Sequence, residues 1–187
     1  MPAPLAGPDR FAVLAGAVAD PVRRYLWRRT DEATADDVLA ATLSVLWRRL
    51  ADVPEDDPIA WSIGVARLQL QNARRMQRRQ VLLTHRIAVV DPPQEVRDAD
   101  GPSATDDAVR FVLSRLRESD AELLRLWSWE ELDARQIGEV LGITPNAASI
   151  RLHRARLRFA ELYEGRAAQD PTQDPTQDPT TTEGGAR

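Results

Sequence analysis

Apolar residues recur at spacings of three or four along most of the chain, which predicts an all-helical protein. The first such stretch covers residues 11–19. A second helix is predicted to begin at Pro21, because proline disfavours helix at the preceding residue and fits the first turn of a new one. In this second helix Val22, Tyr25 and Leu26 are expected to face inward. Its outer face is expected to carry Arg23, Arg24, Arg28 and Arg29.

Two further helices are predicted before residue 80. The first opens at residues 34–37 and presents a broad apolar face as far as Leu50. Residues 52–58 then hold four acids and two prolines, a composition typical of a loop. The next helix runs from residue 59 or 60 to about residue 79, with several arginines at its far end. Its inward side chains are expected to be Trp61, Val65, Leu68 and Met76.

The helical pattern stops at about residue 84 and returns at residue 105. The segment between is acidic, contains proline and lacks periodicity, as linkers between domains do. One helix is then predicted over residues 105–116, and another behind a capping box formed by Ser119 and Glu122. After residue 163 the sequence Gln-Asp-Pro-Thr occurs three times, and this polar, proline-rich composition predicts a disordered tail.

Residues 132–163 carry the clearest local signals. Asp133 and Gln136 have the spacing of a capping box, which would open a short helix that Gly142 ends. Thr144 and Pro145 then suit the N-cap and the first position of another helix. The apolar stripe of that helix consists of Ala148, Leu152, Ala155, Phe159 and Leu162. A helix, a glycine turn and a basic helix predict a helix-turn-helix, which places its second helix in the major groove of DNA.

The exposed faces of that second helix are basic, and no acid occurs between residues 141 and 160. A surface helix stabilised by its own side chains usually alternates acids and bases at a spacing of four. The missing acids therefore favour a DNA-reading helix over the alternative, which is an ordinary helical hairpin with a solvated basic face.

Charge is segregated along the chain, although the net charge is only −4. Residues 60–90 hold six arginines and no acid, whereas residues 91–107 hold six acids and one arginine. The chain uses arginine and no lysine, which suits phosphate and guanine contacts but equally fits the codon bias of a G+C-rich genome. This distribution favours discrete basic surfaces over a general nucleic-acid coat.

Composition also bears on metals, membranes and catalysis. The absence of cysteine excludes disulfides and thiolate metal sites, and His85 and His153 are too few for an ordinary zinc site. Residues 1–10 show no secretory leader and no segment approaches the roughly 20 apolar residues of a membrane span, so we expect a cytoplasmic protein. The carboxylates of residues 52–57 have no paired histidine, so we expect neither an enzyme nor a cofactor.

Taken together, residues 9–163 resemble the extracytoplasmic-function class of bacterial RNA polymerase sigma factors. Residues 35–47 are similar to sigma region 2.2. The matches to regions 2.3 and 2.4 are Ala60, Trp61, Val65, Ala66, Arg67, Arg74 and Arg75. The matches to region 4 are Ile137, Gly138, Leu141, Gly142 and residues 151–156. All three matches occur in the family's order, which makes the resemblance far more specific than a helix-turn-helix alone.

This resemblance implies an all-α fold with two helical domains joined by a flexible linker. The region 2-like domain would cover residues 9–82, the acidic linker residues 83–104, the region 4-like helix-turn-helix domain residues 105–164 and the disordered tail residues 165–187. It also implies three kinds of partner. These are the polymerase core, bound through the clamp of its largest subunit and the flap of its second subunit, then promoter DNA, and an anti-sigma factor.

The resemblance further implies three groups of site residues. The minus-35 element would be contacted by Asn146, Ser149, Ile150, Arg151, His153, Arg154, Arg156 and Arg158. The melted minus-10 element would be contacted by Trp61, Arg67, Asn72, Arg74, Arg75, Arg78 and Arg79. The polymerase would be contacted by Asp36, Asp37, Ala40, Ala41 and Ser44. Arg156 and Arg158 are better placed for the DNA backbone than for bases.

Some positions depart from the family pattern. Ala40 and Ala41 stand where the family has a Gln-Glu pair, and Leu68 stands where Asn is usual. The acidic loop at residues 52–57 lies where the family approaches single-stranded DNA, which carboxylates would repel.

Two other functions fit the same helices. A stand-alone helix-turn-helix regulator would bind duplex DNA without polymerase. A protein-interaction module would have its basic faces covered by one small inhibitory protein.

Overall fold

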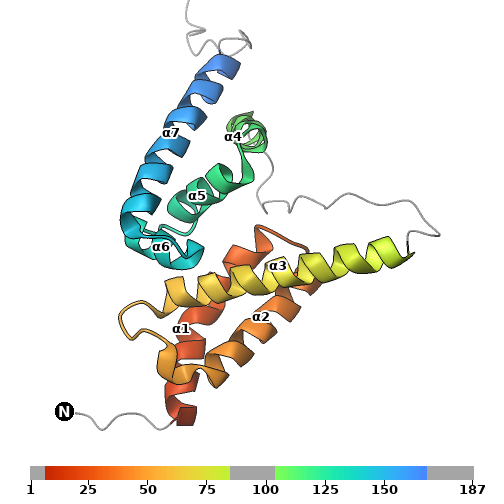
Figure 1. The fold of residues 1–187 in the computed structure, drawn as a ribbon, viewed down its shortest axis with the longest axis vertical. Coiled ribbons are helices and arrows are strands. Elements are labelled where there is room, and N and C mark those ends of the chain that lie inside the picture. The colour runs from red at the N-terminus through yellow and green to blue at the C-terminus, as the bar shows by residue number, and fades with distance from the viewer. Residues whose placement is uncertain (1–6, 85–103, 168–187) are drawn as a thin grey trace, which may run out of the picture.

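The computed structural model describes residues 7–84 and 104–167, and all regular structure in these ranges is helical. The N-terminal domain consists of helix α1 (Gly7–Trp27), helix α2 (Glu32–Arg48), the short 3-10 helix η1 (Leu50–Asp52) and helix α3 (Pro58–Thr84). The C-terminal domain consists of α4 (Ala104–Arg115), α5 (Glu118–Ser128), α6 (Ala134–Leu141) and α7 (Pro145–Ala167). The all-helical, two-domain prediction is therefore confirmed, and Figure 1 shows the C-terminal domain seated on α3 through α6.

Helix α1 runs without a break through Pro21, so the predicted interruption at residue 20 is wrong. Proline inside a helix removes one backbone hydrogen bond and costs about 3 kcal/mol. Burial on both sides of it offsets that cost, because Val18, Val22 and Leu26 are completely buried and Tyr25 is nearly so. The core of the N-terminal domain holds the helix together where the local signal favours a stop.

Helix α2 begins at Glu32, a little before the predicted start at residues 34–37. Asp31 is its N-cap, and the backbone N–H of Thr34 donates to the Asp31 carboxylate over 2.9 Å. This hydrogen bond lowers the pKa of Asp31 below its ordinary value, because it favours the charged form.

Helix α3 turns a partly different face inward from the one predicted, since Trp61 and Val65 are only half-buried. Leu68 and Met76 are 56% and 69% exposed, which contradicts their assignment to the core. The buried stripe consists of Ala60, Ile63, Ala66 and Leu70. The far half of α3 extends beyond the other helices of its domain, so Met76 has no core to enter (Figure 1).

Helix α5 begins at Glu118, and its N-cap Arg117 makes no side-chain cap hydrogen bond. The capping box predicted for Ser119 and Glu122 is therefore wrong. The carboxylate of Glu122 instead faces the other domain, where it pairs with Arg29.

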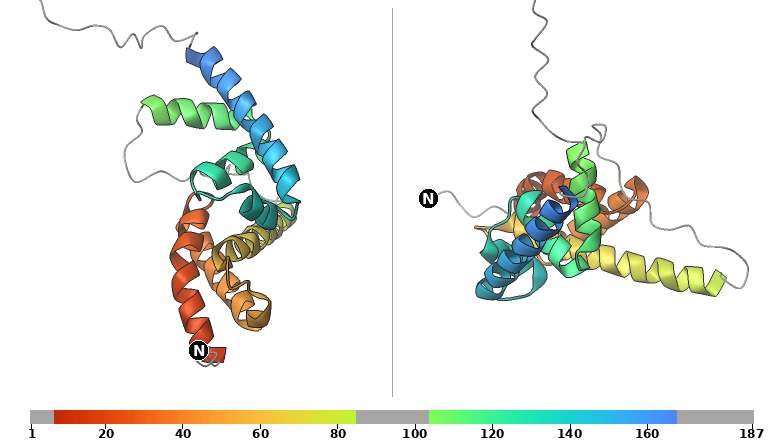
Figure 2. Two further views of the ribbon diagram at one scale, coloured as in Figure 1. Left: turned by 90° about the vertical axis from the view of Figure 1, so that its left-hand side faces the viewer. Right: turned by 90° about the horizontal axis from the view of Figure 1, so that it is seen from above.

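The two domains meet along α3 and α6, which lie side by side in both views of Figure 2. A Cβ atom at Gly64 of α3 would lie 3.5 Å from the Cα of Val140, so the two helix backbones approach closely. Most of the predicted linker, most of the predicted tail and His85 lie outside the described residues, and the domain boundaries remain predictions.

Candidate nucleic-acid interface

The turn between α6 and α7 is fixed by short-range geometry. Both bonds of the predicted capping box are present: the Gln136 backbone N–H donates to Asp133, and the Asp133 backbone N–H donates to the Gln136 side chain. Gly142 closes α6 in the left-handed region at φ 68°. The backbone N–H of Ala147 donates to the Thr144 hydroxyl over 3.2 Å at the start of α7. The predicted helix-turn-helix is therefore confirmed in its caps and its turn.

Gly138 is required for close packing within this turn. A Cβ atom at this position would lie 2.8 Å from the carbonyl oxygen of Ile143 and 3.3 Å from the nitrogen of Pro145. In addition, the Ile143 N–H donates to the Gly138 carbonyl oxygen over 2.9 Å. Without a side chain at 138, the chain entering α7 lies directly against α6.

Helix α7 presents its predicted DNA-facing residues to solvent. Ala148, Leu152 and Ala155 are buried as predicted, Phe159 is half-buried, and Leu162 is 40% exposed, so the buried stripe is one residue shorter than predicted. The exposed side chains include all eight residues of the predicted minus-35 group: Asn146, Ser149, Ile150, Arg151, His153, Arg154, Arg156 and Arg158.

Two of these eight residues contact neighbouring helices. The guanidinium of Arg156 lies 4.6 Å from the ring centroid of Trp127, and Arg158 pairs with Asp120 of α5. Arg151 and Arg154 make no ion pair with any of the described residues. The available charge of α7 is therefore concentrated at Arg151 and Arg154, nearer the N-terminal end of the helix.

The predicted minus-10 residues lie along α3. Asn72, Arg74, Arg75, Arg78 and Arg79 are exposed, whereas Trp61 and Arg67 are half-buried. Trp61 packs below the guanidinium of Arg49, which lies 5.8 Å from its ring centroid. Arg74 donates to the backbone carbonyl of Arg29 over 2.5 Å. The structure therefore gathers most of this group on one exposed arginine-rich helix.

The acidic loop after η1 is paired with arginines. Asp52 pairs with Arg49 over 2.9 Å. Asp57 is only 5% exposed: one oxygen accepts from the backbone N–H of Ala60 at the start of α3, and the other pairs with Arg135 of α6 over 2.7 Å. Burial and the nearby Asp57 carboxylate raise the pKa of Glu139 above its ordinary value. In this arrangement Asp57 is a helix cap and an interdomain contact.

The predicted polymerase-binding residues form one face of α2. Asp36, Asp37, Ala40 and Ser44 are exposed and Ala41 is half-buried. The opposite face packs into the core through Ala35, Val38, Leu39, Thr42 and Leu46. Helix α2 is therefore buried on one side only and leaves the predicted contact face free.

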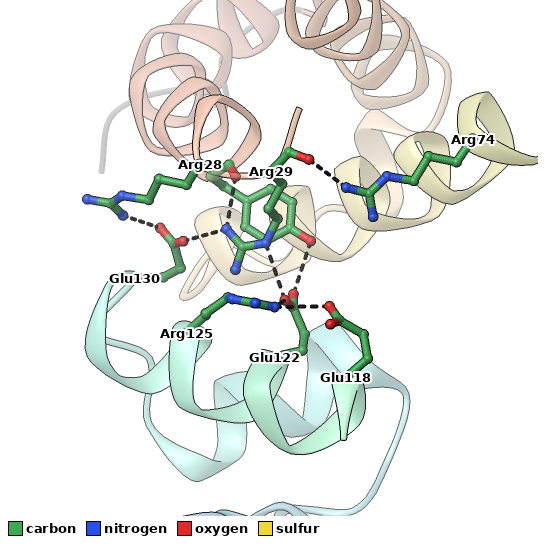
Figure 3. Close-up of polar contacts among 8 residues, drawn as sticks. Arg28, Arg29, Arg74, Glu118, Glu122, Arg125 and Glu130 are labelled. Carbon is green, nitrogen blue, oxygen red and sulfur yellow. Dashed lines mark hydrogen bonds and ion pairs between the residues drawn. The ribbon is translucent and has the colours of Figure 1, made fainter. Parts of the chain in front are cut away.

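An ion cluster between the domains was not anticipated from the sequence. Arg29 pairs with Glu122 over 3.3 Å and with Glu130 over 2.9 Å, and all three side chains are at least 87% buried. Arg28 reaches Glu130 over 3.2 Å (Figure 3). It also donates to the carbonyl of Trp129 over 3.0 Å. The prediction that Arg28 and Arg29 lie on an outer face is wrong, because the second domain covers that face.

The chemistry of this cluster depends on its neighbours. The Arg29 guanidinium lies 3.8 Å from the ring centroid of Tyr25, whose hydroxyl donates to Glu122 over 3.3 Å. Burial and the Glu122 charge raise the pKa of Tyr25 above its ordinary value. Burial lowers the pKa of Arg29, but the surrounding acids outweigh it, so the pKa is raised overall. Arg29 therefore remains charged inside the interface.

A groove of about 1080 Å³ opens beside this cluster, between the two domains. Arginines of α3 and α7 lie on its walls, namely Arg67, Arg74, Arg151, Arg154 and Arg158. Residues of the predicted minus-10 group and of the predicted minus-35 group therefore line the same groove.

The part of the chain that the structure describes lacks two features, one common to metal sites and one to membrane proteins. It contains no group of three metal-ligating side chains. No described helix is both long and apolar enough to cross a bilayer.

Comparison with protein families gives a match in the C-terminal domain. Residues 106–159 match the family described as "Sigma-70, region 4", a range that contains nearly all of α4, all of α5 and α6, and α7 as far as Phe159. Comparison with curated protein sequences gave no significant match.

Two solved structures have a similar fold over most of the chain. The first is the sigma factor RpoE in complex with the anti-sigma factor NepR from Bartonella quintana, with 16% identity over 84% of this chain and 96% of that chain and a TM-score of 0.58. The second is CnrH in complex with the cytosolic domain of CnrY, with 20% identity over 83% of this chain and 88% of that chain and a TM-score of 0.54. Residues 106–159 therefore match sigma-70 region 4, and the chain as a whole has a fold similar to that of the sigma factor RpoE.

Proposed function

We propose that this protein is an RNA polymerase sigma factor that directs the core enzyme to specific promoters. The observation that carries the proposal is the region 4 match within a chain whose fold is similar to that of a sigma factor over 84% of its length. The exposed arginine face of α7, which holds no acid before Glu161, supports it, because a helix that enters the major groove must present such a face to DNA.

In this proposal α7 reads the minus-35 element. Arg151 and Arg154 are the residues we expect to contact bases, because neither is paired with another described side chain. A bidentate contact from arginine to guanine discriminates against the wrong base by about 1–3 kcal/mol. Arg156 and Arg158 would contact phosphates, which add salt-dependent affinity without sequence information.

The N-terminal domain would bind the minus-10 element of the promoter and the polymerase clamp. The arginines along α3 would bind the melted minus-10 strand, because an exposed basic helix tracks the backbone of single-stranded DNA. The exposed face of α2 around Asp36, Asp37 and Ala40 would bind the polymerase clamp. The region 4 domain would contact the polymerase flap.

Two further assignments follow from the same proposal. RpoE of Bartonella quintana was solved with an anti-sigma factor, and we propose a partner of that kind for this protein. We also propose that the protein acts in the cytoplasm as a binding protein without catalytic activity of its own.

The test is transcription in vitro from genomic promoter fragments with purified core polymerase. We expect transcripts that core polymerase alone does not produce. The double variant Arg151→Ala with Arg154→Ala should lose minus-35 recognition while it still binds the core, because the α2 face is unchanged. Arg24→Ala, which removes an exposed arginine from α1, is the matched control and should transcribe normally.

The competing function makes a different prediction in this experiment. A stand-alone regulator would shift duplex DNA without polymerase and would produce no transcript above that of the core alone. Equal loss of core binding and promoter recognition in the double variant would contradict the division of work between α2 and α7.

A further inference from the structure

We propose that the buried ion cluster of Arg29 with Glu122 and Glu130 is a latch that keeps the two domains closed, and that the latch must open before both promoter elements can be bound. This inference rests on the proposed sigma-factor function. It concerns the free protein and how its own domains regulate each other.

The first step of the argument is geometric. The names of the minus-10 and minus-35 elements place them about 25 base pairs apart, which is about 85 Å of B-form DNA. In the closed protein, Arg67 and Arg74 of α3 lie on the same groove as Arg151 and Arg154 of α7. One groove cannot serve two sites so far apart, so α3 and α7 must separate on a promoter.

In the closed protein, Arg74, one of the proposed DNA-binding residues, is also engaged by the protein itself. Arg74 donates to the backbone carbonyl of Arg29 over 2.5 Å, at the end of α1 beside the cluster (Figure 3). While this hydrogen bond is present, the Arg74 guanidinium is turned toward the protein. The closed arrangement therefore masks part of the minus-10 surface in addition to limiting the reach of α7.

The cluster is placed where it can control the opening. Arg29 follows the last turn of α1, whereas Glu122 and Glu130 belong to α5 and to the segment just after it. Figure 3 shows the Arg29 guanidinium between the two carboxylates at the boundary of the two domains. When the domains separate, all three charges pass from the buried interface into water.

A second ion pair connects the domains at another point. Arg135 of α6 pairs with the buried Asp57 over 2.7 Å and lies 3.9 Å from Asp56. Arg135 is itself 53% exposed, so water screens this pair more than it screens Arg29. We therefore assign the main latch to the Arg29 cluster.

One hydrogen-bond donor of the latch has no partner within the described part of the closed protein, which lowers the free-energy cost of opening. The Nη2 atom of Arg29 is buried and has no hydrogen-bond partner among the described residues. A buried donor without a partner pays its desolvation cost in the closed state and recovers it in water. Buried ion pairs in general gain little net stability over their solvated charges. A partner that binds the separated domains can thus open the latch at modest cost.

The first test measures domain separation in the free protein. Because the chain has no cysteine, Ala12→Cys and Glu161→Cys provide two exposed positions for fluorescent labels, one in each domain. We expect a short interdomain distance that increases when Glu122→Gln and Glu130→Gln are introduced together. These changes keep side-chain shape but leave Arg29 without a charged partner, so the open fraction should rise about tenfold or more. Glu118→Gln is the control, because Glu118 is 80% exposed and pairs only within α5.

An unchanged distance in the Glu122→Gln, Glu130→Gln protein would overturn the latch. Loss of helical circular dichroism would instead mean that the variant had failed to fold. The second test avoids that outcome by locking the closed state.

The second test uses a disulfide across the α3–α6 contact. A Cβ atom at Gly64 would lie 3.5 Å from the Cα of Val140, so the two Cα atoms are at most about 5 Å apart, within disulfide range. The Gly64→Cys, Val140→Cys protein should lose transcription at least tenfold when oxidised and recover it on reduction. Each single variant is a control and should be insensitive to oxidation.

Equal transcription by the oxidised and reduced double variant would overturn the inference. Failure of the wild-type protein to support any transcription would instead overturn the proposed function. In that case the interdomain distance would still decide whether the closed state depends on Arg29.

Discussion

Helix α6 takes part in two contacts of different character. Toward α7 it packs through backbone, with Gly138 against the Ile143 carbonyl and with Gly142 in the left-handed conformation. Toward α3 it also has a close approach, at Gly64 and Val140, but charged groups flank that contact. The same short helix therefore belongs to a fixed motif on one side and to a charged boundary on the other.

The difference lies in what water can replace. Opening the α6–α7 turn would expose Ile137 and Ala148, which are fully buried, and water offers nothing in exchange for lost apolar contacts. Opening the α3–α6 boundary would expose the buried Val140 as well, but it would also release Arg29, Glu122 and Asp57, whose charges water solvates well. A DNA-reading motif benefits from the first kind of contact, and a separable pair of domains needs the second.

Among the changes that test this comparison, Gly138→Ala is expected to have the largest effect on stability. The added Cβ would lie 2.8 Å from the Ile143 carbonyl oxygen, a backbone atom that cannot move without shifting the start of α7. We expect the free energy of unfolding of the C-terminal domain to fall by about 3 kcal/mol, as for other overpacked sites. We also expect DNA binding to weaken. Chemical denaturation followed by circular dichroism measures the loss.

Gly165→Ala is the matched control for this change. No atom lies within 4 Å of a Cβ at position 165, and the residue is part of α7. Alanine favours helix over glycine, so this variant should be unchanged or slightly more stable. A loss of the same size in both variants would mean that general helix effects, and not the turn, determine stability.

A smaller effect on the same side of α6 is expected from Asp133→Ala. The change removes the carboxylate that accepts the Gln136 backbone N–H over 2.8 Å. Loss of an N-cap of this kind costs about 1 kcal/mol. Asp133→Asn keeps an acceptor at the same place and should retain most of that stability in the same denaturation experiment. Equal losses in the two variants would show that the charge of Asp133 matters and its capping geometry does not.

The sequence predicts the α6–α7 side of this comparison well, for a physical reason. The signals at Asp133, Gly142 and Thr144 act within three or four residues, so their partners are visible in the sequence itself. The same holds for the exposure of Arg151 and Arg154, because the buried stripe between them is regular. Which of these residues contact DNA remains a prediction.

The α3–α6 side was missed because its partners are distant in sequence. Arg29 and Glu130 are separated by 101 residues, and the periodicity of α1 alone places Arg29 on an outer face. Glu122 has the spacing of a capping residue, yet its carboxylate is used by Arg29. The register of α3 failed similarly, since Leu68 and Ile63 are both apolar and only the neighbouring helices decide that Ile63 is buried. A clue was present in the acidic loop, whose carboxylates required a cationic partner.

The smallest effect is expected from Arg135→Ala, which tests the charged side of α6. Arg135 is 53% exposed, so its pair with Asp57 contributes no more than about 1 kcal/mol after solvent screening. The N-cap bond from the Ala60 N–H to Asp57 remains, so α3 should keep its start and neither domain should lose helix. What should change is the interdomain distance of the labelled protein, by less than in the Glu122→Gln, Glu130→Gln variant. A larger opening from Arg135→Ala than from the paired glutamate changes would place the main latch at Asp57, and the buried position of Arg29 would then be a consequence of closure.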